Sequence, residues 1–236
     1  MDLPQELLDD ILSRIPPHDI ESLKNCSLVS KSWVEPSRRV LFANVYIPLH
    51  AYESWKDTIS PSNTLLHHAR SLEYFYISAQ YTPYRQHSFY VLRDYLPSFP
   101  QLRTLKLHSI NIEPSISDNL ELLSAFQHTL ASLSLTSVSV AWSSFVVLVG
   151  YFPNLRDLAI FETSLQADDL PISTTIHAGR GSLSVDATTA GLFCDRFAEL
   201  KPEYSELRLI GRYDRRLVAA VERSLQSLNL SRCYCT

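Results

Sequence analysis

The chain has 236 residues, of which 45% are hydrophobic and 19% are charged, and its 21 Lys and Arg against 25 Asp and Glu give a formal net charge of −4. This length is enough for one or two domains with a sizeable core, and the apolar content excludes a disordered chain. A DNA-binding protein would normally carry a basic stripe that neutralises phosphates, so the acidic balance argues against nucleic acid as a partner.

The sequence also lacks the usual signals of membrane insertion and secretion. No run of about eighteen apolar residues predicts a membrane span. The first ten residues, MDLPQELLDD, are acidic where a secretory signal would be basic and then apolar. We therefore expect a soluble intracellular protein, cytoplasmic or nuclear, whose four cysteines are reduced.

Residues 1–40 predict three short helices. The first helix starts near Pro4 and has an apolar stripe at three- and four-residue steps, formed by Leu7, Leu8, Ile11, Leu12 and Ile15. Pro16 and Pro17 cannot continue this helix, Asp19 is expected to cap a second one, and Ser30 a third. Three helices of this size cannot bury all their large side chains among themselves. Part of the apolar surface must therefore face a partner chain or the rest of this chain.

The same stretch resembles the F-box. That family's pattern has a Leu-Pro opening and an acidic-apolar helix, then a Pro-Pro-x-Asp break and a Leu-Val-Ser-x-x-Trp element. Here these are Leu3-Pro4, Glu6 to Ile15, Pro16-Pro17-x-Asp19, and Leu28-Val29-Ser30 with Trp33. The resemblance implies docking to the Skp adaptor of cullin-based ubiquitin ligases, and therefore a substrate receptor that binds a protein client.

The adaptor contacts expected from this resemblance are Leu3, Pro4, Leu7, Leu8, Ile11, Leu12, Ile15, Pro16, Ile20, Leu23, Leu28, Val29, Ser30 and Trp33. Two alternatives stay open. The helices can form an ordinary cap whose apolar faces all pack on the downstream domain. The chain can also be a scaffold that binds the same adaptor without a role in a ligase.

Beyond the helices, an irregular repeat of apolar-x-x-apolar-x-apolar predicts short strands. Its copies are Phe42/Val45/Ile47, Leu72/Phe75/Ile77, Leu102/Leu105/Leu107, Leu130/Leu133/Leu135, Leu155/Leu158/Ile160, Tyr204/Leu207/Leu209 and Leu225/Leu228/Leu230. A weaker copy with Leu183 and Val185 starts at Arg180, and the intervals are then 30, 30, 28, 25, 25, 24 and 21 residues. The pattern resembles a leucine-rich-repeat solenoid, whose units of about 20 to 29 residues each contain a strand and a helix or helical turn.

This resemblance implies an α/β fold with a parallel sheet. We expect the F-box at 1–40, a first strand and connector at 41–71, and the leucine-rich-repeat-like domain at 72–236. Helices are expected between the strands, at 87–96, 118–128, 141–151, 187–200 and 214–224. Regular repeats have an asparagine three residues after the last strand position, where Ile110, Val138 and Thr163 stand here. A side-chain ladder is therefore in doubt, and a non-repeat α/β domain is the alternative.

Residues between the apolar strand positions are expected on the open face of the sheet, where repeat proteins usually bind partners. The expected client contacts are Tyr74, Tyr76, Lys106, His108, Phe161 and Arg208, with the aromatic rings as anchors. The alternative is that these rings cover strand edges or pack beneath loops. The last strand motif, Leu225 to Leu230, has six residues after it, so we expect an exposed sheet edge there.

No set of residues predicts catalysis, so we expect no enzyme, no cofactor and no metal. The loop Gly179-Arg180-Gly181-Ser182 lacks the phosphate-binding lysine and is interpreted as a tight turn. Cys233 and Cys235 could supply two zinc ligands, but no second pair with suitable spacing accompanies them. Cys233 is also fourth from the end, as in a prenylation motif, but Tyr234 and Cys235 are not aliphatic and no polybasic run precedes them. Solvated thiols are the interpretation we adopt.

Overall fold

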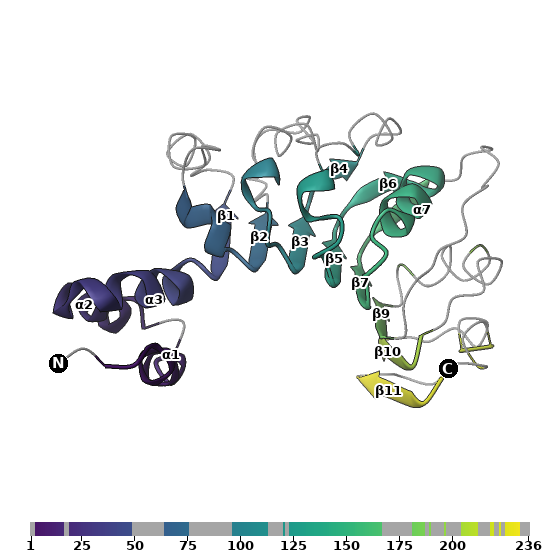
Figure 1. Cartoon of the computed structure of the whole chain (residues 1–236). Coiled ribbons are helices and arrows are strands. Elements are labelled where there is room, and N and C mark those ends of the chain that lie inside the picture. The colour runs from purple at the N-terminus through teal and green to yellow at the C-terminus, as the bar shows by residue number, and fades with distance from the viewer. Residues whose placement is uncertain are drawn as a thin grey trace, which may run out of the picture.

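The chain folds into three helices followed by a row of strands (Figure 1). The computed structural model describes residues 3–16, 19–48, 64–75, 96–112, 120, 123–166, 181–186, 189, 196, 204–211, 218–219, 222 and 225–231. Among the helices of these residues, none is long and apolar enough to cross a membrane.

The three helices predicted at the N-terminus are present as α1 (Gln5–Ser13), α2 (Ile20–Val29) and α3 (Lys31–Leu41). The predicted cap of α2 is confirmed, because the Asp19 carboxylate accepts a hydrogen bond from the Ser22 N–H at 3.1 Å. Ser30 stands at the N-cap of α3, but its hydroxyl lies 2.7 Å from the Ser32 hydroxyl and makes no capping bond. Helix α3 contacts both α1 and α2 and leads directly into the first strand.

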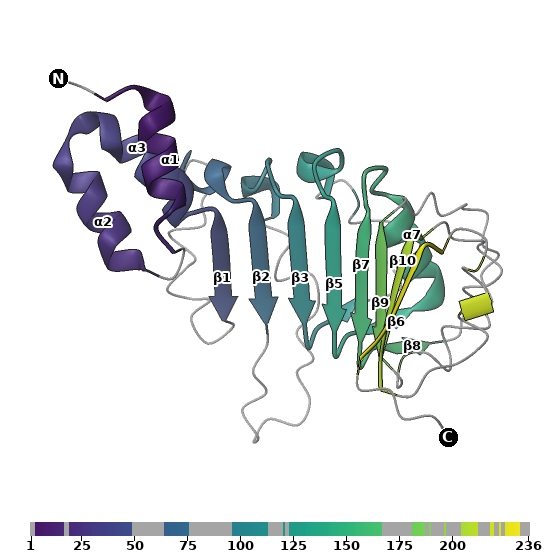
Figure 2. The ribbon, with the colours of Figure 1, turned by 90° about the horizontal axis from the view of Figure 1, so that it is seen from below.

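Within the described residues, two parallel sheets follow. The eight-stranded sheet contains β1 (Asn44–Pro48), β2 (Ser71–Phe75), β3 (Thr104–His108), β5 (Ser132–Thr136), β7 (Asp157–Phe161), β9 (Ser182–Asp186), β10 (Glu206–Ile210) and β11 (Ser227–Ser231). Its strands stand in chain order and pair in parallel, and Figure 2 shows β1, β2, β3, β5 and β7 side by side with their arrows pointing the same way. The three-stranded sheet contains β4 (Asn111–Ile112), β6 (Ser139–Ala141) and β8 (Ser164–Gln166). The predicted parallel sheet and mixed α/β class are confirmed.

The core lies on one side of the larger sheet, because alternate residues of a strand point to opposite faces. In β3 and β5 the buried residues are Leu105, Leu107, Leu133 and Leu135, in alternation with partly exposed ones. The core side is covered by η3 (Leu96–Ser98), η4 (Ser124–Phe126), α7 (Trp142–Gly150) and the smaller sheet. Phe126 and Phe152 stack there with ring centroids 5.9 Å apart. Figure 1 shows α7 and β6 on the outer side of the arc of strands, and no helix or smaller-sheet strand of the described residues lies on the inner side, which we call the open face.

A repeated turn connects the two sheets. Directly after β3, β5 and β7, the residues Ser109, Ser137 and Glu162 have positive φ angles of 53°, 54° and 50°. The next residues, Ile110, Val138 and Thr163, are buried and stand immediately before β4, β6 and β8. The positions where regular repeats have asparagine therefore extend the core in this chain. The doubt about a side-chain ladder is justified at these three positions.

The register of β2 differs from the predicted one. The repeat pattern aligned Phe75 with Leu105, but the sheet pairs Leu72 with Leu105 and Tyr74 with Leu107. Leu72 is buried and takes the first inward position of the strand, while the buried position ahead of it is supplied by Ala69. The predicted strand is therefore displaced by three residues, and Ser71 and Glu73 alternate with the buried Leu72.

The predicted helices are confirmed only in part. Residues 141–151 contain α7, and residues 118–128 contain the short helix η4. Another short helix, η2 (Thr64–His68), precedes β2. The predicted helices at 187–200 and 214–224 lie mostly outside the described residues, as does 87–96 apart from Leu96, which begins η3.

Candidate docking surfaces

Helix α1 has an apolar surface on two sides. Leu8 and Leu12 are buried against the other helices, because α1 packs on α3. Leu3, Leu7 and Ile11 recur at four-residue steps and are 44%, 50% and 40% exposed. A four-residue step places Leu7 and Ile11 on one face of α1, and Leu3 stands just before the helix, so we call these three partly exposed residues the apolar strip of α1.

The end of α2 has the most exposed apolar side chains of the helical region. Leu28 is 81% exposed and Val29 65% exposed, and Ile20 at the start of the helix is 52% exposed. Leu23 on the same helix is buried and belongs to the helical core. Exposed aliphatic side chains at this density are typical of a surface that a partner protein covers.

The remaining expected adaptor contacts divide by burial. Pro4 and Pro16 are exposed, whereas Ile15, Ser30 and Trp33 are half-buried. Leu8, Leu12 and Leu23 are buried, so the expectation that their side chains contact an adaptor directly is not supported. Their packing holds the helices together and so positions the exposed residues.

One ion pair links α1 to α3, and another lies at the end of α1 itself. The Arg39 guanidinium of α3 donates to the Asp9 carboxylate of α1 at 3.2 Å. Within α1, Arg14 and Asp10 pair at 2.8 Å. Exposed pairs of this kind each contribute about 0.2–1 kcal/mol, so apolar packing remains the main stabilising term.

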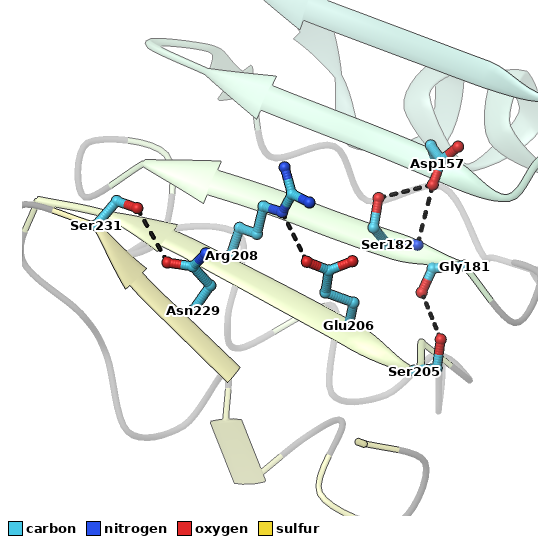
Figure 3. Close-up of polar contacts among 8 residues, drawn as sticks. All are labelled: Asp157, Gly181, Ser182, Ser205, Glu206, Arg208, Asn229 and Ser231. Atoms are coloured by element: carbon cyan, nitrogen blue, oxygen red, sulfur yellow. Dashed lines mark hydrogen bonds and ion pairs between the residues drawn. The ribbon is translucent and has the colours of Figure 1, made fainter. Parts of the chain in front are cut away.

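The open face of the larger sheet is the second surface. At one end, Lys106 donates to Glu73 at 2.9 Å, and the His108 Nε2 lies 3.6 Å from the same carboxylate. At the other end, the Arg208 side chain donates to Glu206 at 2.8 Å (Figure 3). Between these ion pairs most open-face positions have short side chains, namely Ser132, Ser134, Thr136, Ala159, Ser182 and Ser184. Asp157 and Phe161 of β7 and Asp186 of β9 lie in the same rows, so the face also has a carboxylate and an aromatic ring near its centre.

The expected client contacts do not all share this face. Lys106, His108, Phe161 and Arg208 occupy its rows as predicted, with Arg208 exposed and the other three partly exposed. Tyr74 pairs in register with Ile47 and Leu107, and the structure does not describe its side chain. Tyr76 lies outside the described residues. The sequence did not single out Tyr46 of β1, which is 48% exposed.

Burial is the main cause of the shifted pKa values of His108 and Tyr204. Burial lowers the pKa of His108 below its usual value of 6.5, Glu73 partly opposes this shift, and Lys106 adds to it. Burial also raises the pKa of the Tyr204 phenol, with a contribution from the negative charge of Asp157. Neither group belongs to a cluster that could hold a metal, since the described residues contain no group of three or more His, Cys, Asp and Glu suited to one. Cys233 and Cys235 lie outside the described residues.

Comparison with known proteins identifies the helical region. Residues 1–48, which contain all three helices and β1, match the F-box-like family. No curated protein matches the chain. The class of molecule is thus an F-box-like helical domain followed by a parallel α/β sheet, and the match supports an F-box protein. F-box domains generally bind the Skp adaptor, which agrees with the exposed apolar strip of α1 and the exposed end of α2.

Proposed function

We propose that this chain is the substrate-recognition subunit of a Skp-cullin-F-box ubiquitin ligase. The observation that carries the proposal is the exposed apolar surface of α1 and α2 within the F-box-like region. Leu7 and Ile11 on one face of α1, and Leu3 just before the helix, remain exposed in the folded chain. Their exposure argues against the alternative in which all apolar faces of the helices pack on the downstream domain.

The second part of the proposal concerns the sheet. We propose that residues 72–236 form a leucine-rich-repeat-like domain whose open face binds a protein client. Strands in chain order, alternate buried leucines and a recurring turn with positive φ support a repeat architecture. Repeat proteins usually bind their partners on the open face of their stacked strands.

In this account the chain has no catalytic chemistry of its own. It acts in the cytoplasm or nucleus by holding the client near the ubiquitin-conjugating enzyme, which raises the effective concentration of the client's lysines. The competing function is a scaffold that binds the adaptor without a ligase. Adaptor binding is common to both functions and cannot separate them.

Co-purification distinguishes the two functions. We expect the affinity-tagged chain, isolated from cells treated with a proteasome inhibitor, to retain adaptor, cullin and ubiquitylated proteins together. A Leu28→Ala, Val29→Ala variant should lose all three, because the cullin is reached through the adaptor. Retention of the adaptor without cullin or ubiquitylated proteins would contradict the ligase function and favour the scaffold.

A further inference from the structure

Three arginines lie in a row at the end of the larger sheet where its strands begin. The residue immediately before each of four successive strands donates its backbone N–H to the equivalent residue of the preceding unit. Arg70 donates to the Ala43 carbonyl, Arg103 to Arg70, Ala131 to Arg103, and Arg156 to Ala131, each at 2.8 Å. This chain of hydrogen bonds places Arg70, Arg103 and Arg156 in register at the edge where β2, β3 and β7 begin. We call these three residues the arginine row.

The three guanidinium groups are available for an external anion. All three side chains belong to exposed residues. Among the described residues none of the three groups has an ion-pair or hydrogen-bond partner, whereas Arg14, Arg39 and Arg208 are all paired with carboxylates. Three unpaired cations in one row repel one another. An anion that bridges them relieves this repulsion, so it is bound more favourably than by an arginine that is already paired.

The spacing of the row indicates the form of that anion. Neighbouring strands lie about 4.8 Å apart, so the backbones of Arg70 and Arg103 are one spacing apart and those of Arg103 and Arg156 two. The row is therefore a line of roughly 14 Å. A single phosphate is a point anion that binds best where donors converge. A line of separate charges instead fits several carboxylates, each of which can pair with one guanidinium through two hydrogen bonds.

We propose that the arginine row binds an acidic segment of the protein client, rich in Asp and Glu, which runs across the strands. An extended peptide places alternate side chains about 7 Å apart, which matches the scale of the row. The inference rests on the proposed client-binding function and assigns a charge class to the client. The net charge of −4 of the whole chain, with Asp157 directly after Arg156, makes a nucleic acid the less favoured occupant.

Peptide binding to the full chain tests the proposal. The probe is a fluorescent peptide of alternating Glu and Ser, about twelve residues long so that it spans the row. Its binding is measured by fluorescence anisotropy. Replacing Arg70, Arg103 and Arg156 with alanine should weaken binding about tenfold, since each exposed ion pair contributes a modest amount. Arginine-to-lysine variants should bind with an affinity between those of the wild type and the triple alanine variant, because they retain the charge but lose the paired hydrogen bonds.

A matched control removes three cations elsewhere. Arg14→Ala, Lys24→Ala and Lys31→Ala lower the net charge equally but change only the helices, and should leave the affinity within about twofold. A peptide with Gln in place of Glu should not bind. Thermal melting of each variant checks that the fold is intact. Adaptor co-purification, measured on the same preparations, shows whether the proposed function fails separately from the row.

Four results would overturn the proposal. They are unchanged peptide binding by the triple alanine variant, equal binding of the Gln peptide, tighter binding of a peptide with one phosphoserine, and tighter binding of an RNA oligonucleotide. The third would indicate a point anion, and the fourth a different class of partner. If adaptor binding persists in any of these cases, the result rejects the acidic client of the arginine row and leaves the proposed adaptor-binding function standing.

Discussion

His108 shows how a single residue of the open face can make stability depend on pH. Its ring lies 3.6 Å from the Glu73 carboxylate, which also accepts a hydrogen bond from Lys106 at 2.9 Å. Burial is the largest influence and lowers its pKa below 6.5, despite the attraction of Glu73. The folded chain therefore favours the neutral ring more than the unfolded chain does.

This shift predicts a loss of stability in mild acid. Below pH 6.5 the unfolded state takes up the His108 proton more readily than the folded state, so the free energy of unfolding should fall as the pH decreases through this range. His108→Gln should remove this part of the pH dependence, as measured by urea denaturation between about pH 7.5 and 5. The same substitution at the exposed His128 is the control. A His108→Gln variant with the wild-type pH dependence would show that another group is responsible.

At the scale of elements, the junction of β7 and β9 is the least regular in the larger sheet. The neighbouring pairs β5–β7 and β9–β10 each have five residues in register, but β7 and β9 have only three. At the start of this junction the Asp157 carboxylate accepts hydrogen bonds from the Ser182 N–H at 3.2 Å and hydroxyl at 2.7 Å (Figure 3). Gly181 lies so close to β7 that a Cβ would stand 2.1 Å from the Arg156 carbonyl oxygen.

This close approach predicts that the stability of the fold requires glycine at position 181. Gly181→Ala should lower the free energy of unfolding by about 1–3 kcal/mol, because the carbonyl that the new methyl group meets belongs to the backbone and cannot rotate away. Ala131→Gly removes a Cβ at the equivalent position before β5, and should cost at most about 1 kcal/mol. Urea denaturation of both variants measures the difference. Equal stability of Gly181→Ala and the wild type would mean that β7 and β9 can move apart at this junction without lowering the free energy of unfolding.

Local sequence signals predicted the elements better than their register. The three helices follow from Pro16, the Asp19 cap and the apolar spacing, all of which act within a few residues. The strands follow from apolar residues at alternate positions, which are buried in the sheet. The register of β2 was missed because Leu72 satisfies the repeat motif at its first apolar position, while the sheet places it at the second.

Two features of the sheet had weak signals in the sequence. The left-handed turns are occupied by Ser109, Ser137 and Glu162, whereas glycine or asparagine would have indicated them. The arginine row has no apolar periodicity of its own, although each arginine stands immediately before a strand. Which side of α1 remains exposed depends on how the helix packs in the fold. The spacing of its leucines alone does not determine this.

At the scale of the whole molecule, the two proposed surfaces belong to different parts of the chain. Figure 1 shows the helices beside β1 at one end of the row of strands and β11 at the other end. Substitutions on α1 or α2 should therefore change adaptor binding without changing the open face. This separation also provides a matched control, because Leu228 and Leu230 of β11 are 43% and 44% exposed and lie at the far end of the sheet.

The affinity of the purified chain for the Skp adaptor is the most direct test of the account. Leu28→Ala with Val29→Ala should weaken binding at least about tenfold, because exposed apolar side chains that become buried contribute roughly 1 kcal/mol or more each. Leu228→Ala with Leu230→Ala should leave it unchanged, and exposed substitutions should change stability little. Calorimetric titration of the adaptor into each variant measures the effect. Wild-type affinity in the Leu28, Val29 variant, or no adaptor binding by the wild-type chain, would contradict the central claim.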